Sequence, residues 1–371
     1  MKKIITSVLI SALCLGIFSG CSKANTESDK ISPPSFTQAA AETRTVTDWN
    51  QRTVEIPAEI DSVICVGVGS LRYTTYLQAL DLVSGVEEHE IGADCTRPFS
   101  YVNQSLFKTL PITGNNGKTY DEQIIAVDPD VIVAFYDAEK ADSLQKKLGI
   151  PVVTIPHLEG ILDEKVFFTL DFLGDLYGRK ERAQELTEYL KEIQKDIETR
   201  IAPETSAPSV YVSGVSYKGA HGFEGTEAGY APLAALKAVN IADAFGKGLP
   251  FDMDMEEVLR QDPDYIFVCN EELVQKQYAQ NPEFFRSFSA VKEGHVYSQI
   301  SYRNCATNTE MALANLYYMG SVLYPDAFRD VEPAAKTNEI LNKFLGVSDY
   351  YSTLQDAGYR FEKMDLGNEG K

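Results

Sequence analysis

Residues 121–134 read DEQIIAVDPDVIVA and residues 255–268 read MEEVLRQDPDYIFV, and the two stretches align without a gap. Each stretch begins with a short amphipathic pattern and reaches Asp-Pro-Asp, where the proline disfavours continuation of a helix. Each then ends in four apolar residues, which is typical of a parallel strand covered on both faces. The sequence therefore predicts one helix–strand unit used twice, once in each half of the chain.

The segments around each repeat alternate between strand and helix patterns. In the first half we expect a strand that turns into a glycine-rich loop at 61–69, further strands at 82–86 and 151–155, and helices at 71–80 and 138–148. In the second half we expect strands at 209–213 and 296–297 and a helix at 232–238. Strands that alternate with helices favour parallel sheets. The predicted fold class is α/β, with two Rossmann-like lobes.

The segment between the two halves has a helical pattern. Apolar residues recur through residues 162–200 at intervals of three, four and their sums, which predicts one long helix, although Gly174 and Gly178 are positions where it could bend. A single long helix between two lobes is a stiff connector that permits small rocking better than wide hinge motion.

The N-terminus has the pattern of an export signal. Lys2 and Lys3 precede a short apolar run that ends in Ser19-Gly20-Cys21, and this arrangement resembles a bacterial lipoprotein signal in which Cys21 receives the lipid. The alternative is an ordinary signal peptide in which Cys21 is incidental. The polar residues that follow cannot bury enough surface to order themselves, so we expect a flexible tether.

These patterns divide the chain into six parts. They are a signal peptide at 1–20, a tether at 21–44, an N-terminal lobe at 45–160, a connecting helix at 161–201, a C-terminal lobe at 202–333, and a C-terminal helix and tail at 334–371. We expect the last part to be helical at first and then polar and mobile. No run after the signal is long and apolar enough to suggest a membrane span.

Composition narrows the possible functions. The 371 residues carry a formal charge of −20 and are 44% hydrophobic, which is sufficient for two domain cores. An acidic chain of this kind argues against nucleic-acid binding, because phosphate backbones require basic patches. It does not exclude an anionic ligand, since a local basic pocket can exist on an acidic protein.

Four cysteines remain after Cys14 and Cys21 are set aside. Cys65 and Cys269 lie in apolar strand-like runs and are predicted to be small core residues, whereas Cys95 and Cys305 have no clear assignment. The chain has no CxxC pair, so a zinc ribbon is disfavoured. A disulfide is possible outside the cytoplasm, but the sequence does not assign one.

Polar loops that follow the predicted strands supply candidate ligand groups, because ligands of α/β sheets bind beyond the carboxyl ends of the strands. Glycines allow close backbone approach, arginines suit anionic groups, and Tyr or His could bind iron or hydrogen-bond to a chelate. The candidates are Gly69, Arg72, Arg97, Tyr101, Asn115, Tyr217, His221, Tyr302 and Arg303. Each could instead serve a turn, a salt bridge or a hydrogen bond within its loop.

Three further stretches carry a family resemblance. They are VTDWNQRTVEIP at 46–57, SVICVGVGSLR at 62–72 and VKEGHVY at 291–297. In their order and spacing, together with the repeat, they resemble the ABC-importer binding proteins that include ferric-siderophore and vitamin B12 binders. The resemblance implies two lobes joined by a long helix and a small-molecule ligand in the cleft between them. It also implies a monomer without a cofactor that works outside the cytoplasm with an ABC permease and its ATPase.

The resemblance further implies that one surface carboxylate on each lobe docks on basic residues of the permease. Glu122 and Glu256 occupy matching positions in the repeat and take this role here. The alternative is that both are ordinary acids early in a helix, where the helix dipole favours them.

Several functions remain to be compared. An iron chelate is the preferred ligand, with molybdate or tungstate as an alternative and cobalamin or haem as another. A bare zinc or manganese binder is disfavoured, because the chain has only four histidines. An enzyme is disfavoured because no Gly-x-Ser-x-Gly, P-loop or His-Glu-x-x-His motif occurs. A surface adhesion protein would explain the anchor but not the paired lobes.

Overall fold

The structure is a computed structural model, and it describes residues 42–201, 206–246 and 249–366. The predicted signal peptide, Cys21 and nearly all of the predicted tether lie outside the described residues. The described residues belong to one compact unit. Among the helices of the described ranges, none is both long and apolar enough to span a bilayer.

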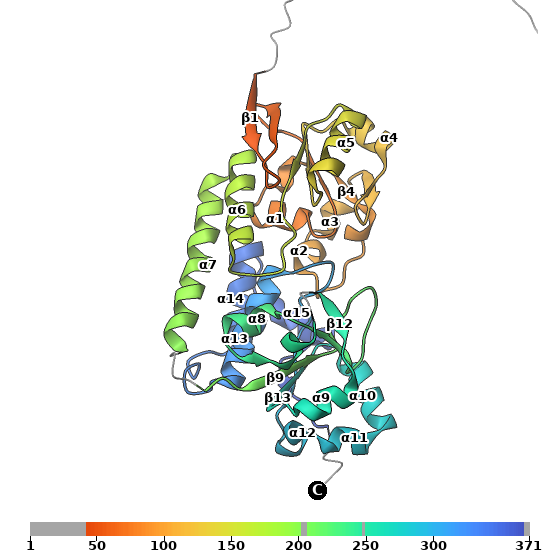
Figure 1. The fold of residues 1–371 in the computed structure, drawn as a ribbon. Coiled ribbons are helices and arrows are strands. Elements are labelled where there is room, and N and C mark those ends of the chain that lie inside the picture. The colour runs from red at the N-terminus through yellow and green to blue at the C-terminus, as the bar shows by residue number, and fades with distance from the viewer. Residues whose placement is uncertain (1–41, 202–205, 247–248, 367–371) are drawn as a thin grey trace, which may run out of the picture. The chain divides into compact units, whose positions relative to one another are not determined.

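The N-terminal lobe is built on a six-stranded sheet in the order β6-β5-β4-β3-β7-β8 (Figure 1). Its strands are β3 (Val63–Val66), β4 (Val83–Glu87), β5 (Ile112–Asn115), β6 (Lys118–Thr119), β7 (Val131–Ala134) and β8 (Val152–Thr154). All pair in parallel except β6, which is antiparallel to β5. The lobe also holds the hairpin of β1 (Thr43–Thr47) and β2 (Thr53–Pro57) and the helices α1 (Leu71–Tyr76), α2 (Pro98–Tyr101), α3 (Gln104–Phe107), α4 (Asp121–Val127) and α5 (Ala138–Leu148).

The C-terminal lobe has a five-stranded sheet in the order β11-β9-β13-β14-β15. Its strands are β9 (Ser209–Ser213), β11 (Val239–Asn240), β13 (Tyr265–Val268), β14 (Val296–Ser298) and β15 (Glu362–Lys363), and only β15 is antiparallel. A separate ribbon pairs β10 (Gly225–Glu227) with β12 (Pro250–Asp252). The helices are α8 (Ala231–Ala235), α9 (Met255–Gln261), α10 (Glu271–Gln280), α11 (Pro282–Ser287), α12 (Ser289–Glu293) and α13 (Thr309–Leu323).

The repeated stretch forms the same structure in both lobes, as predicted. After α4 and α9 the first aspartate of each Asp-Pro-Asp, Asp128 or Asp262, takes a left-handed conformation and ends the helix. The second aspartate, Asp130 or Asp264, accepts backbone N–H groups at or just before the start of the neighbouring strand, β3 or β9. The motif therefore ends a helix and aligns two adjacent strands in each lobe.

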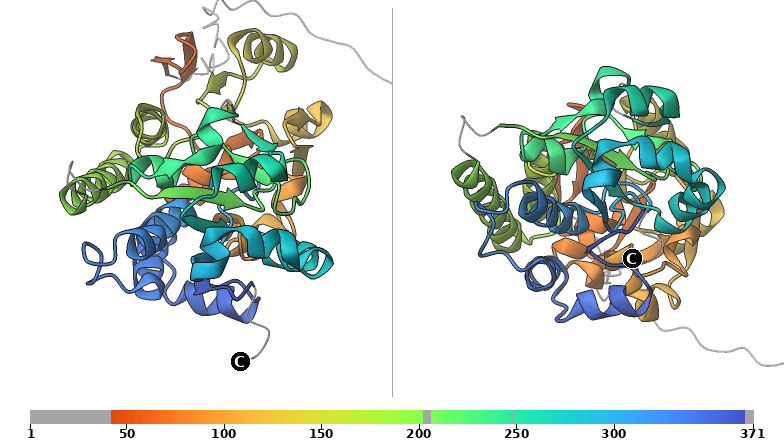
Figure 2. Two further views of the ribbon diagram at one scale, coloured as in Figure 1. Left: turned by 60° about the horizontal axis from the view of Figure 1, so that its bottom comes forward. Right: turned by 90° about the horizontal axis from the view of Figure 1, so that it is seen from below.

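The connecting segment differs from the prediction of one long helix. It forms two helices, α6 (Glu164–Leu176) and α7 (Lys180–Arg200), which lie side by side in all three views (Figures 1 and 2). The chain reverses at Gly178, whose φ of +64° lies in the left-handed region that favours glycine. Only α7 passes from one lobe to the other, and its 21 residues span about 30 Å.

The C-terminal segment also differs from the expected mobile tail. After α14 (Pro333–Leu345), the chain forms α15 (Tyr350–Asp356) and then β15, which adds an edge strand beside β14. The hydroxyl of Tyr350 donates to the carbonyl of Cys95 at 2.9 Å, so this segment contacts the N-terminal lobe as well.

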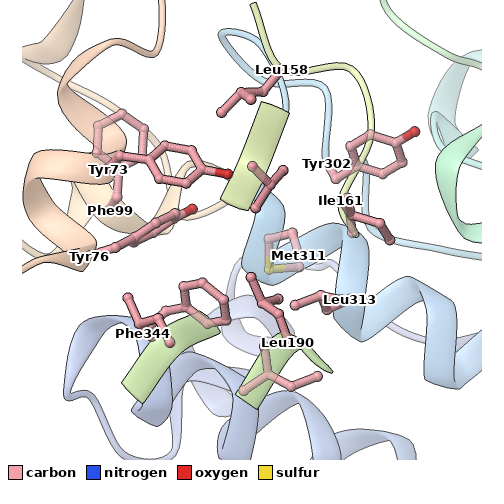
Figure 3. Packing of buried hydrophobic residues seen from close by; sticks show 14 of the residues in the cluster. Tyr73, Tyr76, Phe99, Leu158, Ile161, Leu190, Tyr302, Met311, Leu313 and Phe344 are labelled. Carbon is pink, nitrogen blue, oxygen red and sulfur yellow. The ribbon is translucent and has the colours of Figure 1, made fainter. Parts of the chain in front are cut away.

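One hydrophobic cluster extends through both lobes by way of the helices between them. Tyr76 of α1 and Phe344 of α14 make an edge-to-face contact with ring centroids 4.8 Å apart (Figure 3). Two smaller clusters cover the outer sides of the two sheets. Because α1, α7, α13 and α14 share this cluster, the lobes are held by packed side chains as well as by the chain that links them.

Candidate functional site

A cavity of 680 Å³ opens at the carboxyl ends of the C-terminal strands. Its wall is mostly polar and comes from the segments after β9, β13 and β14, from the chain before β15, and from Thr96 of the N-terminal lobe. The lining residues include Ser216, Gly219, Cys269, Glu271, Glu272, Gln299, Ser301, Arg303, Asn304, Arg360 and Glu362. This is the edge of a parallel sheet where ligand sites are expected.

The sheet order brings three polar side chains into a row at this edge. The strands β9, β13 and β14 are neighbours, and Ser213 ends the first while Cys269 and Gln299 follow the other two. Two backbone hydrogen bonds extend the pairing to this edge: Cys269 N–H donates to Ser213 O at 2.8 Å, and Gln299 N–H donates to Val268 O at 2.9 Å. Gln299 Nε2 donates to the Tyr230 hydroxyl at 3.0 Å, whereas Gln299 Oε1 and Ser213 Oγ are buried without a hydrogen bond from the described residues. Buried polar atoms of this kind favour a ligand that supplies hydrogen bonds.

Cys269 is half-buried: it packs against the main hydrophobic cluster, as predicted for a core residue, and it also lines the cavity, which was not predicted. It follows the apolar strand β13 directly, and sequence pattern does not show where such a strand ends. Cys65 of β3 is buried in the core, as predicted. Cys65, Cys95, Cys269 and Cys305 are all free thiols.

The loop from Ser301 to Asn308 lies between the lobes and contacts the N-terminal lobe at several points. Asn304 Nδ2 donates to Thr96 Oγ1 at 2.8 Å, and Thr307 Oγ1 donates to the carbonyl of Leu158 at 2.7 Å. Cys305 and Ala306 have φ of +54° and +68°, a left-handed conformation that costs a non-glycine residue roughly 1–2 kcal/mol. The contacts with the N-terminal lobe therefore hold this loop in a strained conformation.

A cluster of buried charges lies on the N-terminal side of this loop. Arg97 Nη1 is 3.8 Å from Glu90 Oε2, and His89 Nε2 is 3.2 Å from Glu90 Oε1. Arg97 Nη2 donates to the carbonyl of His89 at 2.6 Å, but Arg97 Nε and Nη1 are buried without a hydrogen bond from the described residues. Burial raises the pKa of Glu90, but His89, Arg97 and Arg72 together outweigh burial and leave this pKa below its ordinary value.

Glu87 fixes two of the predicted ligand loops. Its carboxylate accepts the N–H of Gly67 at 2.8 Å and the N–H of Gly117 at 2.7 Å. Burial raises the pKa of Glu87, and His89 and the two backbone donors lower it only in part. Because this one side chain joins the loops after β3 and β5, it sets the shape of the N-terminal side of the site.

The structure gives the candidates from the first lobe different environments. Gly69 has a φ of +85° and lies against Arg72. The side chain of Arg72 is buried, donates a hydrogen bond to the carbonyl of Cys305 at 2.7 Å and stacks over the ring of Phe99 at 4.7 Å. Cys305 also lies near Arg97, so Arg72 and Arg97 converge behind the inter-lobe loop. Tyr101 is 40% exposed and contacts Tyr350, and Asn115 donates to Glu88 at 3.1 Å.

The candidates from the second lobe are also dispersed. Arg303 lines the cavity and makes a bidentate ion pair with the buried Glu227. Tyr302 is buried with its ring against Tyr230 at 5.1 Å. Tyr217 is 36% exposed in the loop whose Ser216 and Gly219 line the cavity, and His221 faces away toward Asp252 at 2.7 Å.

The two docking candidates are exposed at matching positions. Glu122 lies in the first turn of α4 and Glu256 in the first turn of α9. Figure 1 shows α4 in the N-terminal lobe and α9 in the C-terminal lobe, at opposite ends of the compact unit.

Sequence reasoning missed most residues of the cavity wall. Gln299 and Asn304 belong to no motif, and they meet only because β14 pairs with β13 and the following loop reaches the N-terminal lobe. Glu87 ends β4 and Glu90 follows it, so their position at the carboxyl end of a predicted strand was the available signal.

Comparisons with known proteins agree with this architecture. The sequence model of a family described as periplasmic binding protein matches residues 72–301. No curated protein sequence matches the chain.

Solved structures show the same fold at low sequence identity. The molybdate-bound molybdate periplasmic binding protein MolA of Haemophilus influenzae is 20% identical with a TM-score of 0.64, over 82% of this chain and 98% of that chain. The TroA-like periplasmic binding protein FepB of Veillonella parvula is 20% identical with a TM-score of 0.61, over 82% and 97%. CeuE of Helicobacter pylori with Ni(II) bound is 16% identical with a TM-score of 0.62, over 85% and 99%.

Proposed function

Because the chain belongs to the periplasmic binding protein family, which supplies ABC importers with small ligands outside the cytoplasm, we propose that it captures a metal chelate, with a ferric siderophore as the leading class. The proposed site is the cavity between the lobes, and the chelate is delivered from it to the permease. Molybdate or tungstate, and cobalamin or haem, are the alternative ligands that the experiment below separates.

The observation that carries this proposal is the polar cavity beside a partly unpaired buried arginine. A volume of 680 Å³ lies in the range of small-ligand pockets and is far larger than a tetrahedral oxyanion requires. Arg97 follows Thr96 of the cavity wall in the sequence and is buried. Its Nε and Nη1 have no hydrogen bond from the described residues, although Nη1 lies 3.8 Å from Glu90 Oε2. An anionic group of a chelate that reached these nitrogens would gain charge-assisted hydrogen bonds.

The charges of the cavity wall also favour a chelate over a free anion. Arg303 and Arg360 are opposed by Glu271, Glu272 and Glu362, so the wall has no excess of positive charge. Burial raises the pKa of Glu271, and the negative charge of the neighbouring Glu362 raises it further. Amides and hydroxyls make up much of the remaining wall and suit a ligand with many polar atoms on its surface.

The test is a ligand screen on the full-length protein purified in detergent. Thermal unfolding and calorimetry would be measured with ferric catecholates, ferric hydroxamates, ferric citrate, haem, cobalamin, molybdate and tungstate. We expect a ferric chelate to raise the melting temperature, and Arg97→Met to weaken its binding by about tenfold or more, because a hydrogen bond to a charged group contributes roughly 1.5–3 kcal/mol.

The matched control is Arg286→Met, which changes a partly exposed arginine of α11 that lies outside the cavity wall. If only molybdate or tungstate binds, the ligand is an oxyanion and not a metal chelate. Binding of haem or cobalamin alone would select the other alternative. If no compound stabilises the protein, the proposed ligand class is wrong.

We also propose that Cys21 carries the lipid that anchors a monomeric protein to the membrane. The support is the signal pattern that ends at Cys21 and the polar segment that follows it. Metabolic labelling with a radioactive fatty acid should label the native protein and not the Cys21→Ala variant. Labelling that persists in Cys21→Ala would contradict the proposal, and light scattering in detergent tests the monomer.

The repeat supports a docking role for Glu122 and Glu256. Both are exposed in the first turns of equivalent helices in the two lobes, so each lobe presents one carboxylate in a corresponding place. Paired charges on a stiff body orient a docking partner and speed encounter. We propose that basic residues of the permease receive them.

A further inference from the structure

A second polar cluster lies beside the loop that borders the cavity. A ring nitrogen of His221, a carboxylate oxygen of Glu224 and a carboxylate oxygen of Asp252 all lie within 4.8 Å of one another. His221 and Glu224 belong to the turn that precedes β10, and Asp252 ends β12, where it pairs with Gly225 in the ribbon. This is the one group of three His, Cys, Asp or Glu side chains within metal-ligating distance among the described residues.

The orientation of the His221 ring is typical of a metal ligand. Its Nε2 is 2.8 Å from the carbonyl oxygen of Tyr217, which can only accept, so this nitrogen carries the hydrogen. The other nitrogen, Nδ1, then faces Asp252 Oδ1 at 2.7 Å. Metal-binding histidines characteristically donate one ring N–H to a carbonyl or carboxylate, which points the other nitrogen at the metal. A lone pair facing a carboxylate is repulsive unless a cation lies between them or the ring holds a second proton.

Glu224 is oriented by the protein in a similar way. One of its oxygens accepts Gln277 Nε2 at 2.7 Å and the other accepts the N–H of Gly222 at 3.2 Å. Each oxygen retains further lone pairs for a cation. The side chain is therefore held in place before any ligand arrives, and hydrogen-bonded carboxylates of this kind surround many metal sites.

The backbone is shaped to bring the histidine close. A Cβ added to Gly225 would lie 2.5 Å from His221 Cβ and 2.9 Å from the carbonyl oxygen of Val215. Only glycine fits this position without a shift of the turn that carries His221. Tetrahedral ligands of one Zn²⁺ at about 2.0–2.2 Å lie roughly 3.4 Å apart. His221 Nδ1 and Asp252 Oδ1, which are 2.7 Å apart, would separate slightly to admit the ion, and the Glu224 oxygen would move toward it. Asp252 is exposed and His221 half-buried, so neither side chain is enclosed in a packed core.

We propose that His221, Glu224 and Asp252 form a divalent-cation site that takes Zn²⁺ by preference, with a fourth position open to water. One imidazole and two carboxylates suit zinc, whereas Mg²⁺ and Ca²⁺ prefer oxygen ligands alone. The ion joins the loop at 216–224 to β12. Since Ser216 and Gly219 line the cavity, the bound ion also restrains one side of its entrance. The proposal does not depend on which ligand the cavity holds.

The test is zinc binding by untagged full-length protein in detergent after removal of metal with EDTA. Calorimetry with zinc chloride should show one equivalent bound. His221→Asn and Asp252→Asn should each weaken binding by about tenfold or more, since changes even to the groups that orient metal ligands cost 10–100-fold. His295→Asn is the matched control, because His295 is a partly exposed histidine that pairs with Glu293 and lies outside this cluster.

Hydrogen exchange gives a second readout of the site. Zinc should slow exchange in residues 216–224 of the native protein but not of His221→Asn. Far-UV circular dichroism and melting in EDTA show whether each variant folds. If zinc does not bind, His221 only makes an ion pair with Asp252. If zinc binding survives both substitutions, the ion lies elsewhere. Either result overturns the proposal.

Discussion

Arg72 Nη2 donates a hydrogen bond of 2.7 Å to the carbonyl oxygen of Cys305, which joins the first helix of the N-terminal lobe to the loop between the lobes. The same guanidinium contacts Asn308 and stacks over Phe99, and its side chain is buried. The structure therefore gives Arg72 a clear role in holding the lobes together, whether or not it also meets a ligand.

We expect Arg72→Met to lower the free energy of unfolding by about 3 kcal/mol, as loss of one member of a buried charge network commonly does. The substitution removes both hydrogen bonds and leaves the buried carboxyl of Glu310 without the cation that lowers its pKa. Urea unfolding measures the change. Arg286→Met, on the surface, should change the stability by less than about 0.5 kcal/mol. Equal effects of the two substitutions would refute the role given to Arg72.

The buried carboxyl of Glu310 should make the free energy of unfolding depend on pH. Burial raises the pKa of Glu310 above its ordinary value of 4.5, although Arg72 and Tyr76 oppose this increase. A carboxyl with a raised pKa binds its proton more tightly in the folded state. Its stabilising contribution is complete below pH 4.5 and is lost as the pH rises through the folded-state pKa. The loss amounts to about 1.4 kcal/mol for each pH unit that separates the folded-state pKa from the unfolded-state pKa.

The substitution Glu310→Gln should remove this loss, because glutamine keeps an acceptor for the Tyr76 hydroxyl without a charge. Urea unfolding at pH 5, 6, 7 and 8 should therefore show the stability of the variant rising relative to the native protein as the pH increases. Glu139→Gln, at an exposed position of α5, serves as the control. A constant difference across this range would show that the Glu310 carboxyl does not titrate as expected.

The two Asp-Pro-Asp motifs differ in one testable detail. Asp128 and Asp262 both have left-handed backbones, but Asp262 accepts two hydrogen bonds from Ser289, whereas the side chain of Asp128 has none from the described residues. Glycine relieves the left-handed strain, so Asp128→Gly should stabilise the protein by roughly 0.5–1 kcal/mol. Asp262→Gly loses the Ser289 contacts and should be neutral or destabilising. Urea midpoints of the two variants compare them, and the reverse order would contradict this account.

The sequence predicted the repeat because its signals are local. Asp-Pro-Asp ends a helix wherever it occurs, and four apolar residues between such signals form a buried strand. Gly178 was identified as a position where the helix could bend, but the full reversal of the chain there was not predicted. The reason is that α6 and α7 both bury apolar faces, so the helical spacing continues across a short turn. Strand β15 was missed because Glu362 and Lys363 have no strand pattern, and only their pairing with β14 defines them.

The site was less predictable because its parts meet through tertiary structure. Arg303 was identified from its loop and lines the cavity, and Arg97 is a neighbour of Thr96 in the wall. Asn304 and Gln299 have no distinguishing spacing in the sequence. They become neighbours of a ligand site only when the sheet order and the inter-lobe loop are known.

The free thiols provide a probe of the cavity. Burial raises the pKa of Cys65 and of Cys269 from the ordinary value of 9.0 to about 12. At pH 8 this lowers the reactive thiolate fraction by about 1,000-fold. Iodoacetamide should therefore label both residues far more slowly in native protein than in urea, as measured by mass spectrometry. A cavity ligand should slow Cys269 further and leave Cys65 unchanged, and rapid native labelling of Cys269 would contradict its burial.

The docking proposal predicts a loss of delivery without a loss of binding. Charge reversal in Glu122→Lys together with Glu256→Lys places a positive charge opposite each basic partner, and like charges at an interface cost several kcal/mol. Ligand affinity in calorimetry should not change, because neither residue lines the cavity. Ligand-stimulated ATP hydrolysis by the reconstituted importer should fall by about tenfold or more. Glu139→Lys with Glu283→Lys is the matched control, since both are exposed acids in first turns of helices outside the repeat. Equal losses in the two double variants would show that net charge, and not the matched pair, governs docking.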